Sequence, residues 1–339
     1  MYPITMGENM KSRRVRFAAG LAAAALILGA CGDDDSSSSS GDNTSGGSSG
    51  QCSELSGESI RIVRNAWTAS ALEAEIMKQL IESQLCVPAE IIDIDENSMF
   101  TGMADGSVDF VTEIWPSGIV ADEQAFIDDG SVVDMGLLGT TGQIGWFVPD
   151  YVMTAHPELA TWEGLMDPAT AKLFATAETG DLGRFLGTDP SYSQYDEPII
   201  KNLGLPLQVV YSGSEAATVA ELDTAVANQE PILMYWWTPT AAVGKYHLQQ
   251  VKLPAYTPGC ADDPAMTACD YPSDPLMKLA SAKLEAKNPQ VWAMLQKVQI
   301  TDEVQLALLP AVEIDQRDPA EVAAEWIAAN QPIWSAWFA

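Results

Sequence analysis

Residues 59–65 read SIRIVRN, residues 71–84 read ALEAEIMKQLIESQ, and residues 89–94 read AEIIDI. The first and third segments have the length and apolar content of strands. The segment between them carries apolar residues at helical spacing, at Leu72, Ile76, Leu80 and Ile81. A strand, a helix and a second strand of these lengths predict a right-handed βαβ unit, and therefore a parallel sheet.

The same alternation continues along the chain. Beyond residue 94, further strands are expected at 107–115, 132–138, 142–148, 208–211 and 231–237. Helices are expected at 99–105, 215–228, 276–285, 289–298, 301–309 and 319–338. Residues 180–186 lead into a turn-rich segment, and the C-terminal part is expected to be almost entirely helical.

Two α/β groups joined by long strands predict a two-lobed architecture of the Venus-flytrap type. The first lobe is expected to comprise residues 57–147 and, after the chain returns, residues 245–339; the second lobe comprises residues 148–244. In such folds a small ligand binds in the cleft between the lobes, at the carboxyl ends of the strands. Closure around the ligand occurs by hinge bending.

The N-terminal region has the order of a bacterial lipoprotein signal. Four basic residues (Lys11, Arg13, Arg14 and Arg16) precede an apolar run at 17–28, and Leu28-Gly29-Ala30-Cys31 follows as a lipobox. We expect residues 1–30 to be a signal peptide, exported by the Sec or the Tat route, and Cys31 to be lipidated. An ordinary signal peptide or a membrane anchor is the alternative. Residues 31–56, rich in Asp, Ser and Gly, predict a disordered tether.

The composition limits the possible partners. The formal net charge is −30, so nucleic acid and anionic lipid are repelled. No apolar stretch past residue 30 is long enough for a membrane span. We therefore expect a protein on the extracytoplasmic side of the cell membrane, attached only through its lipid anchor.

The cysteines fit an oxidising compartment. Beyond Cys31 the chain has an even number, Cys52, Cys86, Cys260 and Cys269. Of the possible pairings we favour Cys52–Cys86 with Cys260–Cys269. A zinc site is the less favoured alternative, because the cysteine spacings do not suit it and the two histidines, His156 and His247, are isolated. We expect no metal and no cofactor.

Three tryptophans stand at the ends of predicted strands. Trp67, Trp115 and Trp237 are each followed within two residues by Pro or a small polar residue. Such positions line an inter-lobe cleft, whereas core tryptophans are more usual in the middle of an element. Several aromatic faces around one pocket form a cage for a quaternary ammonium ion. Buried packing is the alternative for any single one of them.

Several segments, in order, resemble the glycine betaine/choline-binding proteins of ABC importers, the group that contains ProX and OpuAC. The resemblance covers most of residues 57–339. It is carried by DGSVDF with EIWPS at 105–117, GWFVPDYV at 145–152, TDPSYS at 188–193, and WWTP with KYHL at 236–248. It implies a type II-like periplasmic-binding-protein fold and a role in delivering a quaternary ammonium ligand to an ABC permease and its ATPase.

The resemblance also implies roles for particular residues. Trp115, Tyr192 and Trp237 would form the cage, and Trp67 would be its fourth wall. Either Trp146 or Phe147 is a fifth candidate, since strand alternation lets only one face the cleft. Backbone N–H groups of Ser193 and Gln194 would receive a ligand carboxylate.

Four positions bear on the identity of the ligand. Ala69 stands where choline-binding relatives carry Asp, and Ile119 and Thr240 stand near the places where some betaine binders carry His. Glu113 lies on the strand face of Trp115 and either places a negative charge near the ammonium, which favours choline, or is solvated or ion-paired. Glycine betaine is the first choice, and choline or carnitine the alternative.

Other functional classes find less support. The chain has no Gly-x-Ser-x-Gly, HExxH, Walker or Rossmann motif, so we expect no enzymatic activity. An amino-acid ligand would need a carboxylate-clamping arginine, for which Arg184 is the single nearby candidate. A ligand sensor that docks to a membrane receptor remains an alternative. We expect a monomer.

Overall fold

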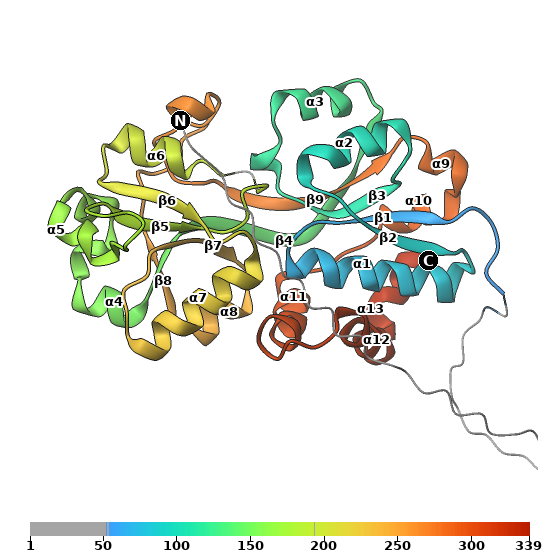
Figure 1. Ribbon diagram of the computed structural model, residues 1–339. Helices are drawn as coiled ribbons and strands as arrows, with labels where there is room; N and C mark the ends of the chain where they lie inside the picture. The colour runs from blue at the N-terminus through green and yellow to red at the C-terminus, as the bar shows by residue number, and fades with distance from the viewer. Residues whose placement is uncertain (1–51, 53, 193) are drawn as a thin grey trace, which may run out of the picture. The chain divides into compact units, whose positions relative to one another are not determined.

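The computed structural model describes residue 52, residues 54–192 and residues 194–339. The predicted signal peptide, Cys31, residues 32–51 of the predicted tether, and Ser193 lie outside the described residues. The described chain forms one mixed sheet (Figure 1). Its strands are β1 (Ile60–Arg64), β2 (Ala89–Asp93), β3 (Phe110–Ile114), β4 (Val132–Pro149), β5 (Gly183–Gly187), β6 (Leu207–Tyr211), β7 (Met234–Thr238), β8 (Leu248–Val251) and β9 (Ser273–Ser281).

The strand order is β2-β1-β3-β9-β4-β7-β5-β6, and β8 pairs with β4. At one end β1 pairs in parallel with β2 and β3, and at the other end β5 pairs in parallel with β6 and β7. The predicted parallel units are therefore present at both ends. Between them β4 and β9 run antiparallel to each other and to their neighbours. We call the two groups of elements the β1 side and the β5 side.

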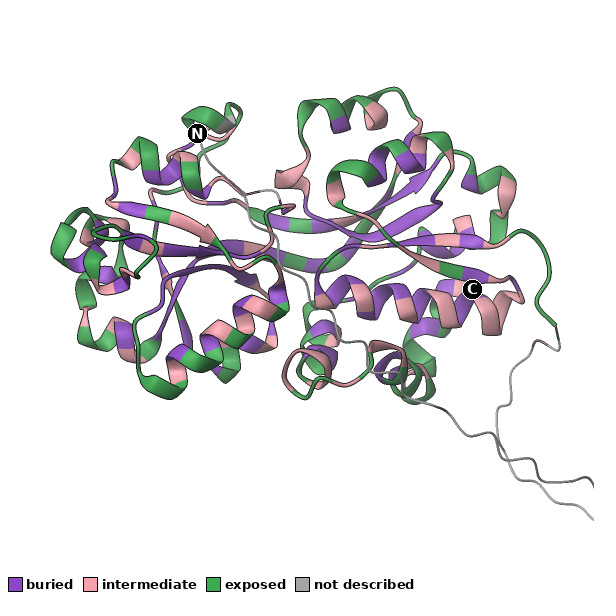
Figure 2. Cartoon of the chain, in the orientation of Figure 1, coloured by how far each residue is buried: buried purple, intermediate pink, exposed green. Residues whose placement is uncertain are grey.

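Helices cover both faces of the sheet. The β1 side carries α1 (Thr68–Leu80), α2 (Glu96–Asp105), α3 (Ala121–Asp128), α9 (Leu284–Lys287), α10 (Pro289–Leu295), α11 (Asp302–Leu309), α12 (Pro319–Ala329) and α13 (Gln331–Trp334). The β5 side carries α4 (Asp150–Ala155), α5 (Pro168–Ala171), α6 (Asp196–Leu203), α7 (Glu215–Asn228) and α8 (Ala241–Lys245). Buried residues follow the strands and the sheet-facing stripes of the helices (Figure 2).

The centre of the sheet corrects the sequence prediction. Residues 276–285 were expected to be helical, but residues 273–281 form β9, which pairs with both β3 and β4. The side chain of Lys278 is buried in this strand, where its ammonium group donates to the carbonyl oxygens of Leu137 (2.9 Å) and Val298 (2.6 Å). The two strands expected at 132–138 and 142–148 are one strand, β4, with irregular register near residues 134–141.

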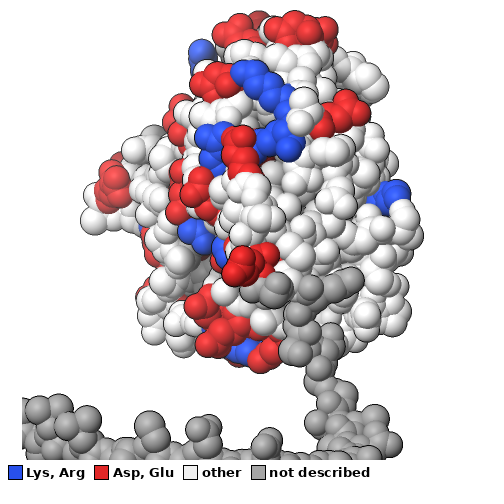
Figure 3. Space-filling model, turned by 90° about the vertical axis from the view of Figure 1, so that its right-hand side faces the viewer, with Lys and Arg blue, Asp and Glu red and all other residues white. Residues whose placement is uncertain are grey.

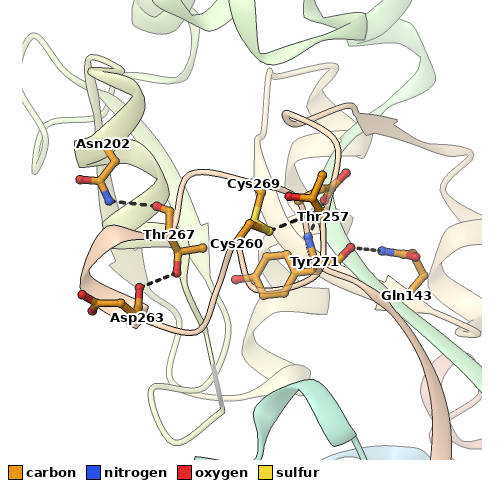
Figure 4. Close-up of a disulfide and its surroundings, with 9 residues drawn as sticks. Gln143, Asn202, Thr257, Cys260, Asp263, Thr267, Cys269 and Tyr271 are labelled. Carbon is orange, nitrogen blue, oxygen red and sulfur yellow. Dashed lines mark hydrogen bonds between the residues drawn. A yellow bond between two sulfur atoms is a disulfide. The ribbon is translucent and has the colours of Figure 1, made fainter.

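The segment before β9 lies on the β5 side. β8 pairs with β4, and the amide of Asn202 in α6 donates to the carbonyl oxygens of Ala265 and Thr267, both at 3.0 Å. Cys260 and Cys269 are joined by a disulfide within this loop, as predicted (Figure 4). The chain therefore reaches the β1 side through β9, whereas the sequence interpretation returned it at residue 245.

The second predicted disulfide, Cys52–Cys86, is also present. It joins the start of the described chain to the residue after the turn that extends α1, where the N–H of Ser56 also donates to the carbonyl of Cys86 at 2.8 Å. The last residues of the predicted tether are therefore attached to the α/β body.

No helix within the described residues combines the length and apolarity needed to cross a bilayer. On the face turned to the viewer in Figure 3, acidic and basic side chains alternate along one band beside broad uncharged areas. Opposite charges are therefore interspersed on this face, and the basic side chains form no separate patch there.

Candidate functional site

A pocket opens between the two sides of the sheet, at the carboxyl ends of four strands. Its lining residues are Trp67, Glu96, Trp115, Gly118, Ile144, Tyr192, Tyr235 and Trp237. Trp67 follows β1, Trp115 follows β3, Tyr192 lies in the loop after β5, and Trp237 lies near the end of β7. The space between these walls, with the mouth included, is about 380 Å³.

The aromatic walls contact one another mainly edge to face. The rings of Trp67 and Tyr192 lie 5.6 Å apart at 86°, and those of Tyr192 and Trp237 lie 5.9 Å apart at 82°. Tyr235 packs 6.1 Å from Trp237, and Trp236 stacks on Trp237 from behind at 4.5 Å. Such contacts fix the orientation of each ring, so the π faces around the pocket are set before a ligand binds.

Trp115 is seated on a glycine. A Cβ atom at Gly142 in β4 would lie 2.9 Å from Cε3 of the Trp115 ring and closer still to Cζ3 and Cη2. Carbon atoms pack at about 3.5–4.0 Å, so no larger residue fits at position 142 with Trp115 in place. The absence of a side chain at Gly142 thus allows this wall of the pocket.

Glu113 holds two of the tryptophans. Its Oε1 accepts a hydrogen bond from the indole N–H of Trp67 and another from that of Trp115, both at 2.9 Å. The amide of Gln305 in α11 lies 3.4 Å from Oε2 and donates at 2.8 Å to Glu73 in α1. Glu113 is 1% exposed, and this burial raises the pKa of its carboxyl to about 7. Burial likewise raises the pKa of Glu73, with the neighbouring charge of Glu113 as the second cause.

Hydrogen bonds join the two sides around the pocket. The hydroxyl of Tyr192 donates to the carbonyl of Ala66 at 2.8 Å, and that of Tyr195 donates to the carbonyl of Ser117 at 2.8 Å. The carboxylate of Glu215 in α7 accepts from the backbone N–H of Thr68 at 2.8 Å and from its hydroxyl at 3.1 Å. Glu215 thereby caps α1, and burial raises the pKa of its carboxyl to about 7.

A second carboxylate, which belongs to the β1 side, caps a helix of the β5 side. Glu313, in the turn that follows α11, accepts from the backbone N–H groups of Ala241 (2.7 Å) and Ala242 (3.2 Å) at the start of α8. Burial, and after it the charge of Glu215, raises the pKa of the Glu313 carboxyl to about 8. Each side thus supplies the cap of a helix on the other side.

The structure brings four of the predicted site residues together. Trp67, Trp115, Tyr192 and Trp237 all line the pocket. Glu113 lies behind two of them and is buried, so the interpretation that it is solvated is wrong. Its partners among the described residues are two indoles, Gln305 and Glu73, and include no cation.

The remaining predicted residues lie elsewhere. Trp146 is fully buried, donates its indole N–H to Asp196 at 2.6 Å and packs on Phe185, so it does not line the pocket; Phe147 does not line it either. The amide of Gln194 donates to the carbonyl of Asp189 at 2.6 Å. Ser193 lies outside the described residues, so the predicted carboxylate contact stays a prediction.

One further lining residue could have been found in the sequence. Tyr235 stands two positions before Trp237 on the same strand, so period-two alternation places both on one face. Ile144 lies opposite Trp237 in the pairing of β4 with β7, a contact that no local pattern indicates. Arg184 pairs with Glu221 at 2.6 Å beside a separate groove and takes no part in the aromatic pocket. Within the described chain, no group of three His, Cys, Asp or Glu side chains has the arrangement of a metal site.

An aromatic pocket between two α/β groups is the architecture of a solute-binding protein, and the comparisons agree. Residues 58–329 match the family model of the substrate-binding domain of ABC-type glycine betaine transport systems. The chain belongs to this family, whose members bind small quaternary ammonium ligands outside the cytoplasm and work with an ABC permease; they are not enzymes. It is 25% identical over 289 residues to the trimethylamine N-oxide-binding protein of Pelagibacter ubique (strain HTCC1062). The aligned part covers 83% of this chain and 90% of that protein.

Solved structures show the same fold. The glycine betaine/L-proline-binding protein ProX of Borrelia burgdorferi superimposes with a TM-score of 0.67 at 18% identity, covering 83% of this chain and 97% of that one. Lactococcal OpuAC, solved in its closed form with glycine betaine, gives 0.65 at 20% identity, covering 83% and 100%. A choline-binding protein in complex with choline gives 0.62 at 16% identity, covering 81% and 91%.

Proposed function

We propose that this protein captures a quaternary ammonium compound in the aromatic pocket and delivers it to its permease, with glycine betaine as the first candidate. The observation that carries the proposal is the lining, which among the described residues comprises five aromatic rings, one carboxylate (Glu96), and no Lys, Arg or His. Each ring face attracts a methylated ammonium by about 0.5–2 kcal/mol. The methyl groups of the ligand are also removed from water when they pack against the rings, which is favourable.

Choline is the second candidate, and the charge around the pocket favours it. Glu96 lines the pocket, and Glu113 and Glu215 lie just behind its walls. A cluster of carboxylates attracts a net cation more strongly than a zwitterion. The name of the Pelagibacter relative adds trimethylamine N-oxide as a third ligand to be tested.

The test is a calorimetric titration of the chain from residue 51 onward with glycine betaine, choline, carnitine and trimethylamine N-oxide. We expect saturable binding of at least one ligand, and a loss of about 10- to 100-fold in affinity in Trp237→Ala, from one ring contact and its buried area. Trp326→Ala is the matched control, because Trp326 is as buried as Trp237 but stacks on Trp337 away from the pocket. Silence with all four ligands in the folded protein would overturn the proposal.

We further propose that Cys31 is lipidated after removal of residues 1–30, which would hold the binding domain at the membrane through residues 32–51. The lipobox at 28–31 supports this. Radiolabelled palmitate should enter the wild-type protein in bacterial cells and should not enter Cys31→Ser. Equal labelling of both would contradict lipidation at this residue.

A further inference from the structure

We propose that Glu113 sets the preference of the pocket between a net cation and a zwitterion, because one buried carboxylate oxygen anchors two walls of the cage. This inference rests on the proposed function, that is, on binding of a quaternary ammonium ligand. Its starting point is geometric: the indole N–H groups of Trp67 and Trp115 come from different strands and meet on the same oxygen of Glu113 at 2.9 Å.

The two hydrogen bonds decide what the tryptophans can offer a ligand. Both indole N–H groups are occupied, so these walls present ring faces and no N–H donor to a ligand carboxylate. An indole whose N–H donates to an anion is polarised, and electron density moves into its ring. The faces of Trp67 and Trp115 are therefore better partners for a cation than free indoles are.

The charge of Glu113 is not neutralised by a cation. Its partners in the described part of the chain are two indoles, the amide of Gln305 and the carboxyl of Glu73. The pocket lining itself adds Glu96 and no basic side chain. The carboxylate of Glu113 contacts the N–H edge of each indole, whereas a ligand ammonium contacts the ring face. The two charges are therefore separated by about the size of one indole ring, and Coulomb attraction in a protein is still appreciable at that separation.

The negative charge of Glu113 also repels a carboxylate on the ligand. A choline-type cation gains the attraction in full, whereas a zwitterion gains it at its ammonium and loses part of it at its carboxylate. Removing the charge of Glu113 while keeping its oxygen should therefore weaken choline more than glycine betaine. We expect a relative change of about 5- to 10-fold, the size of one partly screened charge interaction.

Protonation of Glu113 should have the same effect as removing its charge. The ionisable groups packed around it are Glu73 from α1 and Glu215 from α7, with Glu96 in the pocket lining beyond the rings. Burial raises the pKa of Glu113 to about 7, so this carboxyl changes from mostly neutral to mostly charged across the pH range of the binding experiment. The ammonium group of Lys278 interacts with the charge of Glu73, and no basic group is among the main influences on the pKa of Glu113.

The experiment measures the ratio of the dissociation constants for glycine betaine and choline, from pH 5.5 to pH 8.5, in the wild type and in Glu113→Gln. Glutamine retains an oxygen that accepts from both indoles. We expect the wild-type ratio to shift about 5- to 10-fold toward choline as the pH rises, and the ratio of Glu113→Gln to shift clearly less, by the part that belongs to Glu215, whose pKa burial also raises to about 7. Both ligands keep a constant charge in this range.

The matched control is Asp196→Asn. Asp196 is also fully buried, also accepts an indole N–H, from Trp146, and also has a pKa raised by burial to about 7, but it does not line the pocket. We expect the control to keep the wild-type ratio and its pH profile.

The possible outcomes separate the two levels of the proposal. If the wild type binds neither ligand, the quaternary ammonium function itself fails. If it binds and the ratio is independent of pH, or if Glu113→Gln weakens both ligands equally, Glu113 is only a structural support and the inference is overturned. If Glu113→Gln does not fold, Glu215→Gln decides the point, because it keeps Glu113 and removes the other carboxyl with a pKa of about 7 beside the pocket: a pH shift that persists there supports the inference, and a shift that disappears overturns it.

Discussion

The seat of Trp115 gives the sharpest test of the pocket. In Gly142→Ala no aromatic residue is removed, yet the new methyl group occupies space that the Trp115 ring fills. To restore a carbon–carbon contact of about 3.5 Å from the 2.9 Å at Cε3, and from the closer approach at Cζ3 and Cη2, the ring must move by about 1 Å or more. That movement lengthens the 2.9 Å hydrogen bond to Glu113.

The two changes act on different quantities. A displaced ring gives up one cation–π contact of about 0.5–2 kcal/mol, which predicts a dissociation constant about 2- to 30-fold higher. The hydrogen bond to the buried carboxylate is present with and without ligand, so its weakening, by about 1 kcal/mol, lowers the free energy of unfolding. Isothermal titration calorimetry measures the dissociation constant directly, and quenching of tryptophan fluorescence gives a second readout.

Gly145→Ala is the control on the same strand. A Cβ atom there meets the side chain of Gln250, 3.1 Å from Cδ and closer to the amide nitrogen, and this flexible end can move aside. Alternation along β4 also directs position 145 away from the face of Gly142. We expect its affinity to stay within twofold of the wild type. A folded Gly142→Ala variant with wild-type affinity would refute the assignment of Trp115 as a wall.

Three further predictions concern stability. Glu215→Ala removes the cap of α1 that comes from α7 and should lower the free energy of unfolding by about 1 kcal/mol in urea titrations while weakening ligand binding; unchanged values for both would show that the cap is dispensable. Replacing Cys52 and Cys86 by Ser, which opens a loop of 34 residues, should cost about 4 kcal/mol, and replacing Cys260 and Cys269, 9 residues apart, about 2.5 kcal/mol; the reverse order in urea would contradict the loop-entropy argument. Burial raises the pKa of Glu113, Asp196 and Glu215 to about 7 and that of Glu313 to about 8, so between about pH 4.5 and 8 the folded state binds more protons than the unfolded state. The free energy of unfolding should therefore fall as the pH rises through this window and level off above it, and thermal melts that rise from pH 5 to pH 8 would contradict this sign.

Local patterns predicted the outer parts of the fold well. The helix expected at 215–228 is α7 with the same bounds, because Ser214 caps it and its apolar residues keep a helical period. β1, α1 and β2 lie close to their predicted ranges for the same reason. In each case the information needed was contained within about 15 residues of chain.

The central strand could not be found in this way. The Leu, Met, Lys and Ala residues of 276–280 all favour helix, which is why a helix was predicted there. These residues form β9 because β3 and β4, far away in the sequence, present edges on both sides of them. The buried Lys278 is tolerated since two backbone carbonyls accept from its ammonium group. No pattern within residues 276–280 indicates these neighbouring strands or carbonyl groups.

The candidate site also has parts that the sequence predicted and parts that it did not. Aromatic residues at strand ends were sufficient to select Trp67, Trp115 and Trp237, since the carboxyl ends of the strands meet at one edge. The supports behind them were not predictable: Gly142 meets Trp115, and Gln305 meets Glu113, 192 residues away. Trp146 was selected as a candidate because it lies in GWFVPDYV, one of the segments that resemble the family, whereas its indole N–H donates to the buried Asp196.

The two crossed caps connect the pocket to the contact between the two sides of the sheet. Neither α1 nor α8 is capped by a side chain of its own N-cap residue, and these helices begin next to the pocket walls Trp67 and Trp237. Glu215 and Glu313 supply the missing acceptors from the opposite sides. Separating the sides would leave backbone N–H groups of both helices without these partners and would expose both carboxylates to water. Ionisation is easier in water, so at high pH this exposure offsets part of the cost. We therefore expect that, if the two sides open and close, the contacts around the pocket, ligand affinity and pH are coupled, and that a ligand contacting both sides favours the joined form.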